Sequence, residues 1–366
     1  MHIAIDARII NSSTGRYVER LLTYLEKLDS PHRYSVLVRA KDKDYWQPTK
    51  DNFTVVVADF KDYTFGEQIG FGKFLRKLKP DLVHFCMPQQ PLLYTGPSVT
   101  TIHDLNLLRI KQNDNMSKSV LRSKQLIFRR LLHQVIRRSN HIIVPSQYTA
   151  DDLQKFHRVP IGRITVTHES ADLVSTTPKA VPKYKNVPFL LMVGRTEVYK
   201  NHRGAIEAMQ AMLWRDPKLR LVIVGSRDDS SYELEGWVMT NGYRNIDFFG
   251  FASDEQLAWL YEHCRGYIFA SFMEGFGLPG LEAMKHGAPV ASSNRTSLPE
   301  VYGKAAIYFN PDDVAEMSEV MSRLLNDTTL RKRLTTAGKK RAASYSWERM
   351  AKQTLAVYDN VLKSLK

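Results

Sequence analysis

The chain has 366 residues, 43% of them hydrophobic and 25% charged, which is ordinary globular composition and enough for two domains of roughly 150 residues each. No apolar run approaches the roughly 18 residues that a membrane-spanning helix needs, and two distant cysteines form no disulfide framework. The net charge is +14, and residues 1–180 hold 27 Lys and Arg against 17 Asp and Glu. This positive first half favours an anionic partner, either acidic lipid or nucleic acid.

The first half alternates short apolar runs with helical stretches. MHIAIDARII carries Asp6 and Arg8 within its apolar run, which predicts a first strand rather than a signal peptide. Further runs rich in Val and Ile predict buried parallel strands: YSVLVRA, FTVVVADF, DLVHFCM, SVTTIHDL and NHIIVPS. TADDLQKF predicts a helix capped by Thr149. The proline-rich stretch from Ser175 to Pro188 predicts a linker, so we expect a first domain over residues 1–178.

Residues 109–138 of this first half are strongly basic, with nine Lys and Arg and one acid. One helical stripe is basic and holds Lys118, Arg122 and Arg129. A second stripe is apolar and is expected to face the core: Leu121, Phe128, Leu131, Leu132 and Val135. A basic amphipathic helix suits an anionic membrane surface, and a solvated face of an ordinary packed helix is the alternative.

The second half repeats the strand–helix alternation over residues 179–345. Its predicted strands are FLLMVGR, LRLVIVGS, IDFFG, GYIFASF, APVASS and AAIYF. A long amphipathic helix, SWERMAKQTLAVYDNVLKSL, ends the chain. Two alternating halves of similar size predict an α/β protein with two doubly wound Rossmann-like domains that face each other across a cleft.

The stretch SFMEGFGLPGLEAMKHGAPV places two carboxylates, Glu274 and Glu282, around a glycine-rich loop between a predicted strand and a helix. Backbone N–H groups at Gly277 and Leu278, together with the helix dipole, suit a phosphate. The flanking carboxylates suit hydroxyl groups, a sugar beside Glu274 and a ribose beside Glu282. The pattern therefore indicates a nucleotide-sugar, although two surface acids on an ordinary loop are the alternative.

A second loop supplies cations for a diphosphate. FLLMVGRTEVYKN places Arg195 and Lys200 after the first strand of the second half, where a guanidinium fork and an ammonium point charge suit phosphate oxygens. Taken alone, this loop would be interpreted as carrying two solvated cations. Its combination with the glutamate loop favours a phosphate site.

The motifs together resemble the retaining glycosyltransferases of family 4, which have the GT-B fold. The resemblance covers nearly the whole chain through these segments in family order: STGRYVERLL, TIHDL, VPSQYTADDL, GR…KN, FFGFASDEQL, the glutamate loop, SLPEVYGKAAIYFNPDD and the SW-opened final helix. The GRYV, TIHDL and SLPEV segments are most similar to bacterial mannosyltransferases of O-antigen and related polysaccharides. The resemblance implies a hexosyltransferase that needs no metal or other cofactor and moves mannose from GDP-mannose to a glycan, with another family-4 reaction using a UDP-sugar as the alternative. It also implies that the final helix, residues 346–366, returns to the first domain.

The resemblance assigns roles residue by residue. Glu274 would bind the donor sugar and Glu282 the ribose, while Arg195 and Lys200 would hold the diphosphate and stabilise it as the leaving group. The backbone of Phe276, Gly277 and Leu278 would add N–H donors. From the first domain, Gly15 would allow close approach of the backbone, and His103 would reach the donor sugar. The base would meet the cleft wall around Ser226, Arg227 and Phe251.

The family's lipid-linked acceptors favour membrane docking through Lys118, Arg122 and Arg129, at about 1 kcal/mol for each cation near an acidic surface. We therefore expect a cytoplasmic protein that docks peripherally on the inner face of the cell membrane. Two segments depart from the family: SSTGRY has a single glycine, and THESAD (Thr167 to Asp172) stands where relatives commonly show an N-G-V-D-like segment. Any donor contact from that second segment, Glu169 included, is left open.

Three rival classes remain. A nucleic-acid-binding protein would suit the charge, but no zinc-finger, RNP-like or homeodomain pattern supports it, so we expect no nucleic acid partner. A non-catalytic sugar-binding protein would tolerate loss of Glu274, Arg195 or Lys200, yet all three are present. A GT-B epimerase or phosphorylase fits the glutamate loop beside GR…K less well than a transferase does.

Overall fold

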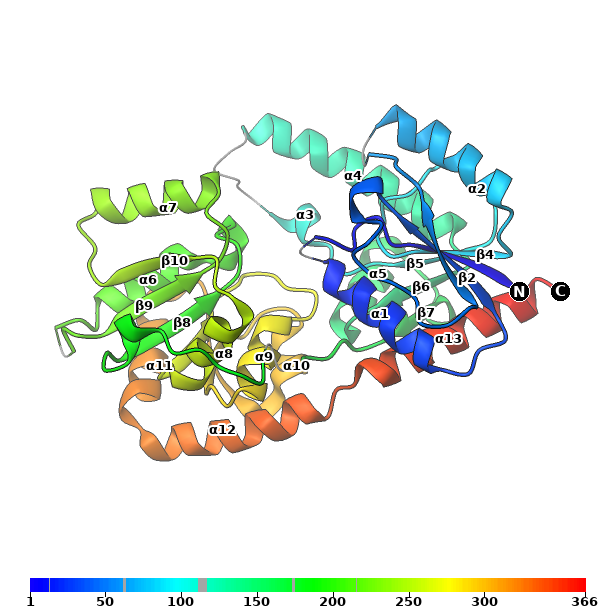
Figure 1. The fold of residues 1–366 in the computed structure, drawn as a ribbon. Helices are drawn as coiled ribbons and strands as arrows, with labels where there is room; N and C mark the ends of the chain where they lie inside the picture. Colours follow the sequence, from blue (N-terminus) through cyan, green and yellow to red (C-terminus); the bar gives the residue numbers. More distant parts are fainter. Residues whose placement is uncertain (13, 62–63, 111–116, 173–174, 215) are drawn as a thin grey trace. The chain divides into compact units, whose positions relative to one another are not determined.

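A computed structural model describes residues 1–12, 14–61, 64–110, 117–172, 175–214 and 216–366. The chain divides into two compact units (Figure 1). The first comprises Met1–Arg109, Arg122–Glu169 and Ser346–Lys366, and the second comprises Ile110–Leu121 and Ser170–Tyr345. Each unit is a parallel α/β sheet with helices around it, so the predicted fold class, two Rossmann-like domains, is confirmed.

The first unit is built on a seven-stranded sheet in the order β3-β2-β1-β4-β5-β6-β7. Its strands are β1 (His2–Asp6), β2 (Arg33–Val38), β3 (Phe53–Val57), β4 (Leu82–Phe85), β5 (Ser98–Thr101), β6 (His141–Val144) and β7 (Ile164–Val166). Its helices are α1 (Gly15–Lys27), α2 (Gly72–Leu78), α3 (Asn106–Arg109), α4 (Lys118–Arg138) from Arg122 onward, α5 (Gln147–His157) and α13 (Trp347–Ser364), with a π-helical turn over Gly66–Phe71. All pairs in the sheet are parallel.

The second unit has a six-stranded parallel sheet in the order β10-β9-β8-β11-β12-β13. Its strands are β8 (Phe189–Val193), β9 (Arg220–Val224), β10 (Ile246–Gly250), β11 (Gly266–Phe269), β12 (Val290–Ser293) and β13 (Ala306–Phe309). Its helices are α6 (His202–Gln210), α7 (Asp229–Thr240), α8 (Asp254–His263), α9 (Leu278–Lys285), α10 (Leu298–Tyr302), α11 (Val314–Asn326) and α12 (Thr328–Ala343).

The strand order reverses direction beside β1 in the first sheet and beside β8 in the second. On the two sides of such a point, the loops that leave neighbouring strands run in opposite directions. This leaves a crevice at the carboxyl ends of the strands, which is where open α/β sheets bind ligands. In the second unit these are the loops after β8 and β11. In the first they are the loops after β1 and β4, next to the loop after β5.

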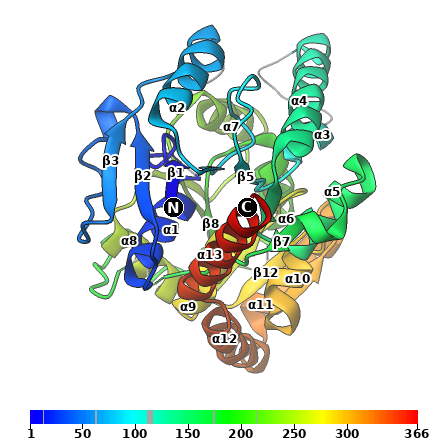
Figure 2. The ribbon, with the colours of Figure 1, turned by 90° about the vertical axis from the view of Figure 1, so that its right-hand side faces the viewer.

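The C-terminal helix α13 packs on α1 within the first unit (Figure 2). Two polar contacts fix it there: His32 Nε2 lies 2.8 Å from Asp359 Oδ1, and His84 Nδ1 lies 2.6 Å from the Tyr358 hydroxyl. Both Tyr358 and His84 are fully buried. The last segment of the chain therefore completes the core of the first unit.

Two local expectations meet the structure differently. The helix expected to start at Thr149 starts earlier, because Ser146 has the extended backbone of an N-cap and its Oγ accepts from the Thr149 backbone N–H. The apolar stripe of α4 does face the core at Leu121, Leu132 and Val135, which are 3% exposed or less. No helix among the described residues is long and apolar enough to cross a membrane.

Candidate active site

The glycine-rich loop after β11 packs against the hydroxyl group of a single tyrosine, Tyr302. Gly277 has φ +100°, and a Cβ there would lie 2.6 Å from the Tyr302 hydroxyl oxygen. A Cβ on Gly280 would lie 2.2 Å from the same oxygen. Tyr302 is fully buried and donates a hydrogen bond of 2.6 Å to the Gly277 carbonyl. The two glycines therefore let Tyr302 support the loop from beneath, and α9 starts directly after it with Pro279 in its first turn.

Glu274 is fixed in this loop through both its backbone and its side chain. Its backbone N–H donates to Thr296 Oγ1 at 3.0 Å, and its carbonyl accepts from Ser297 Oγ at 3.0 Å. Its carboxylate accepts from Lys200 Nζ at 2.6 Å, and the two side chains are only 11% and 16% exposed. The structure thus brings two of the predicted site residues, Glu274 and Lys200, into direct contact.

Lys200 ends a short 3-10 turn in the loop after β8, Val198–Lys200, and its ammonium lies 5.5 Å from the centre of the Phe269 ring. The loops after β8 and β11 are joined by a 2.8 Å bond from the Phe272 N–H to the Tyr199 carbonyl. Arg195 leaves the same strand end, is 57% exposed, and lies 3.5 Å from Asp228. A compact ion pair flanked by an accessible guanidinium therefore marks the carboxyl ends of β8 and β11.

The other predicted donor-binding residues differ in accessibility. Glu282 lies about one turn into α9, is 4% exposed, and accepts from the Tyr261 hydroxyl at 3.3 Å. Phe276 is 4% exposed and packs edge-on against Tyr345. Phe251 follows β10 and is 87% exposed.

In the first unit, His103 lies in the loop after β5 between two oxygen acceptors. Its Nε2 lies 3.0 Å from the Cys86 carbonyl and its Nδ1 lies 3.4 Å from Glu169 Oε1. A carbonyl and a carboxylate only accept, so the ring donates to both only when both nitrogens carry hydrogen. The ring also meets the edge of Tyr17 at 4.8 Å. Glu169 belongs to the THESAD segment, and its carboxylate is thus the side-chain group that contacts a nitrogen of the His103 ring.

A buried hydrogen-bonded chain runs behind His103. The Tyr17 hydroxyl lies 2.9 Å from Thr101 Oγ1, which lies 2.8 Å from His84 Nε2, and His84 Nδ1 meets Tyr358 of α13. Burial, with a smaller contribution from His103, lowers the pKa of His84 to about 3, so this ring is neutral. The chain ties the loop after β5 to α1 and to the C-terminal helix.

Gly15 begins α1 for a steric reason. A Cβ at this position would lie 1.9 Å from the Ile10 carbonyl oxygen, a distance that no side chain tolerates. The glycine therefore lets the loop after β1 turn tightly into α1. Its predicted approach to the donor stays a prediction.

Sequence reasoning missed four residues that support the predicted ones, namely Tyr17, Thr296, Ser297 and Tyr302, and it gave Glu169 no role. Ser297 and Tyr302 lie within SLPEVY and Thr296 directly precedes it, so the resemblance covers this segment without assigning these residues a role. Among the described residues, no group of three or more metal-ligating side chains comes together.

These two Rossmann-like units and the paired loops define a GT-B glycosyltransferase, and comparisons with known proteins place the chain in a family. Residues 14–174 match the model described as Glycosyltransferase Family 4, and residues 175–341 match that of Glycosyl transferases group 1. The chain belongs to the family-4 glycosyltransferases.

Among its relatives is O-antigen chain mannosyltransferase B of Escherichia coli, 31% identical over 295 residues that cover 73% of this chain and 74% of the relative. Serotype-specific mannosyltransferase WbdA of the same species is 40% identical over 243 residues, 63% of this chain but 30% of that longer protein. A solved structure, sucrose-phosphate synthase from Thermosynechococcus elongatus, covers all of both chains with a TM-score of 0.79 at 18% identity. These matches confirm the predicted family and fold, and make the protein a glycosyltransferase.

Proposed function

We propose that the protein transfers mannose from GDP-mannose, with retention of configuration and without a metal, to a hydroxyl of a lipid-linked glycan in O-antigen or similar polysaccharide synthesis. The observation that carries the proposal is the Lys200–Glu274 ion pair at the carboxyl ends of β8 and β11. A sugar diphosphate that enters there meets a cation for its phosphate and a carboxylate for its hydroxyls. The mannosyltransferase relatives support mannose as the sugar.

The site residues divide the work on the donor. Lys200 and the accessible Arg195 neutralise the diphosphate and stabilise it as it leaves, while Glu274 orients the sugar ring. Glu282 meets the ribose, and the backbone of Phe276, Gly277 and Leu278 adds N–H donors at the start of α9. His103 hydrogen-bonds a sugar hydroxyl, and Gly15 and Phe251 line the approach of the donor.

The test is calorimetric titration with GDP-mannose, UDP-glucose, UDP-galactose and UDP-N-acetylglucosamine, followed by turnover with a glycan acceptor. Binding of GDP-mannose that weakens at least tenfold in Lys200→Ala supports the proposal, since a charge-assisted bond contributes about 1.5–3 kcal/mol. A proton NMR spectrum of the product reports the anomeric configuration, and an inverted product contradicts retention. Full activity after exhaustive treatment with EDTA is expected.

A UDP-sugar is the second candidate donor. HepE of Anabaena, solved in complex with UDP-glucose, has a TM-score of 0.73 to this chain and covers 98% of it, at 16% identity. Selective binding of a UDP-sugar in the same panel would retain glycosyl transfer and remove mannose from the proposal.

We further propose that the protein docks on the anionic inner face of the membrane through α4. Lys118, Arg122 and Arg129 supply the charge, and Leu126 on the same helix is 50% exposed. Exposed apolar side chains beside cations suit the interface of an acidic bilayer.

Membrane docking predicts co-sedimentation with vesicles that contain phosphatidylglycerol at low salt and release at high salt, because screening shortens the range of the attraction. Lys118→Gln/Arg122→Gln should reduce the bound fraction severalfold. The matched control Arg137→Gln/Arg138→Gln removes the same charge from the exposed end of the helix and should reduce it less. Equal losses in the two variants, or no binding of the wild type at low salt, would contradict docking through this face.

A further inference from the structure

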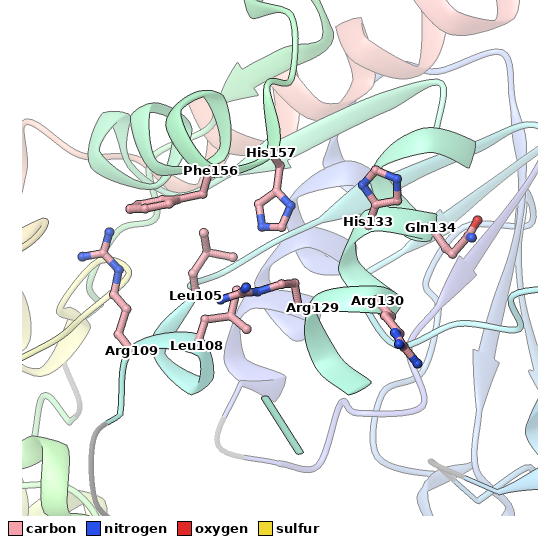
Figure 3. Close-up of a pocket in the computed structure, with 9 residues that line it drawn as sticks. All are labelled: Leu105, Leu108, Arg109, Arg129, Arg130, His133, Gln134, Phe156 and His157. Carbon is pink, nitrogen blue, oxygen red and sulfur yellow. The ribbon is translucent and has the colours of Figure 1, made fainter. Parts of the chain in front are cut away.

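A pocket of about 640 Å³ lies within the first unit, between the segment Leu105–Arg109, α4 and the end of α5 (Figure 3). It is distinct from the loops that carry Glu274 and Lys200, which belong to the second unit. Leu105 and Leu108 form part of its wall from the side of α3. Of the residues that line it, only Arg129 has a role proposed above, in membrane docking.

The pocket is lined by basic side chains from all three segments. They are Arg109 from α3, Arg129, Arg130 and His133 from α4, and His157 from the end of α5. No Asp or Glu is among the residues that line it. Asp152 lies 2.5 Å from Arg109 and neutralises that one guanidinium. In the part of the chain that the structure describes, no ion pair is formed by Arg129 or Arg130, so their charge is available to a ligand.

His157 gives the most direct evidence that the pocket accommodates an anionic ligand. Its Nε2 is buried and has no hydrogen-bond partner among the described residues. In Figure 3 its ring points from α5 toward the side chain of Arg129. Burial first, and then the charges of His133 and Arg129, lower the pKa of His157. Like charges gathered around a hollow are unfavourable alone, and an anion between them would both bond the imidazole and neutralise the guanidinium.

The same pocket has an apolar side. Leu105 is 4% exposed, Leu108 packs on the core, and Phe156 is 55% exposed. The Arg109 guanidinium lies 5.3 Å from the centre of the Phe156 ring, which holds it at the border between the apolar and basic parts. An inorganic anion would leave this apolar surface in water, whereas an amphiphile would cover both parts.

We propose that this pocket binds a phosphate or diphosphate group carried on an apolar chain, the anionic head of the lipid-linked acceptor. The proposal rests on the proposed function for the identity of the acceptor. Leu105 is two residues from His103, so their Cα atoms lie at most about 7 Å apart. An acceptor whose phosphate is held here would have its first sugars near the loop that carries His103.

The test uses octyl phosphate below its micellar concentration, with inorganic phosphate and octyl glucoside as the two partial ligands, titrated into the full chain without vesicles. The pocket variants are Arg129→Gln/Arg130→Gln and His157→Gln. The matched control is Arg137→Gln/Arg138→Gln, which removes the same charge from the same helix at exposed positions outside the pocket. Circular dichroism and melting temperature show whether each variant is folded.

Octyl phosphate should bind the wild type and the control alike and bind the double pocket variant at least tenfold more weakly, as loss of charge-assisted hydrogen bonds requires. His157→Gln should weaken it severalfold. Equal affinity in the pocket and control doubles would overturn the proposal, because net charge alone would explain the binding. Inorganic phosphate that binds as tightly as octyl phosphate would overturn the lipid-borne source.

Donor binding separates this proposal from the one on which it rests. The pocket variants should bind the nucleotide-sugar as the wild type does, while the KM for a lipid-linked acceptor rises at least tenfold. Octyl phosphate binding in a protein that binds no nucleotide-sugar would contradict the proposed function and leave the anion site standing. An acceptor KM unchanged by Arg129→Gln/Arg130→Gln would contradict the acceptor role.

Discussion

At the scale of single residues, the proposed donor site rests on the ion pair of Glu274 and Lys200. Glu274→Gln keeps the shape of the side chain but removes its charge, and with it the charge–charge attraction to Lys200. We expect kcat/KM for the nucleotide-sugar to fall about 100-fold, the effect typical of losing one preorganised polar contact to the reacting group. Steady-state kinetics measures it, with Glu319→Gln on the exposed face of α11 as a control of the same chemistry. Activity that survives Glu274→Gln within twofold would remove this residue from the site.

We expect Glu169 to act through His103, as a positioning residue. Its carboxylate is 3.4 Å from Nδ1 and is 7% exposed, so Glu169→Gln replaces the acceptor with a neutral amide of the same size. We expect kcat to fall about tenfold, as loss of about 1.4 kcal/mol in orientation would give, with little change in the donor KM. A merely structural role would lower kcat in any background. If Glu169 works through His103, the substitution should have no further effect in a His103→Gln protein, and an additive loss contradicts the assignment.

At the scale of elements, the turn into α9 depends on Gly277. Its φ of +100° and the contacts at 2.6 and 2.7 Å to Tyr302 and Leu298 leave no room for a side chain. Gly277→Ala should cost about 3 kcal/mol, the upper part of the range for left-handed strain, and should lower the melting temperature of the second unit by several degrees. Donor binding should weaken with it.

Gly236 provides the opposite case within α7. A Cβ there meets nothing within 4 Å, and the residue lies inside a helix. Gly236→Ala should therefore stabilise by about 0.5–1 kcal/mol through the lower backbone entropy of alanine. Denaturant melts of the two variants side by side check both signs. If Gly236→Ala also proved destabilising, the comparison would no longer attribute the cost of Gly277→Ala to steric clash.

The local sequence pattern was enough to predict the helices and strands. It did not predict the contacts between residues that follow different strands of one sheet. The apolar runs predicted the strands because buried parallel strands need continuous Val and Ile, and the glutamate loop was found because its glycines and proline are local signals. Glu169 and His103 are 66 positions apart and meet only once β5 and β7 flank β6. Ser297 and Tyr302 support the loop of Glu274 from another strand end for the same reason. Even the start of α5 needed geometry, since Ser146 and Thr149 are both good caps by type.

At the scale of the whole molecule, each compact unit carries a buried neutral histidine near a residue of the proposed site. Burial is the larger cause in both cases: it lowers the pKa of His84 to about 3, assisted by His103, and lowers that of His202 to about 3, assisted by Lys200. Each ring takes up a proton in the unfolded chain near its ordinary pKa of about 6.5 but stays neutral in the folded unit until about pH 3.

In that pH window the unfolded state binds more protons than the folded state does. As the pH falls from 6.5 toward 3, each histidine should therefore lower the free energy of unfolding of its unit by about 1.4 kcal/mol per pH unit. The two histidines lie in different units, so calorimetric scans between pH 7.5 and 5 should show both transitions moving to lower temperature. His84→Gln should flatten the pH dependence of the first unit alone and His202→Gln that of the second alone, whatever each variant does to stability at pH 7.5. A slope unchanged by the substitution in its own unit would contradict the buried neutral state of that ring.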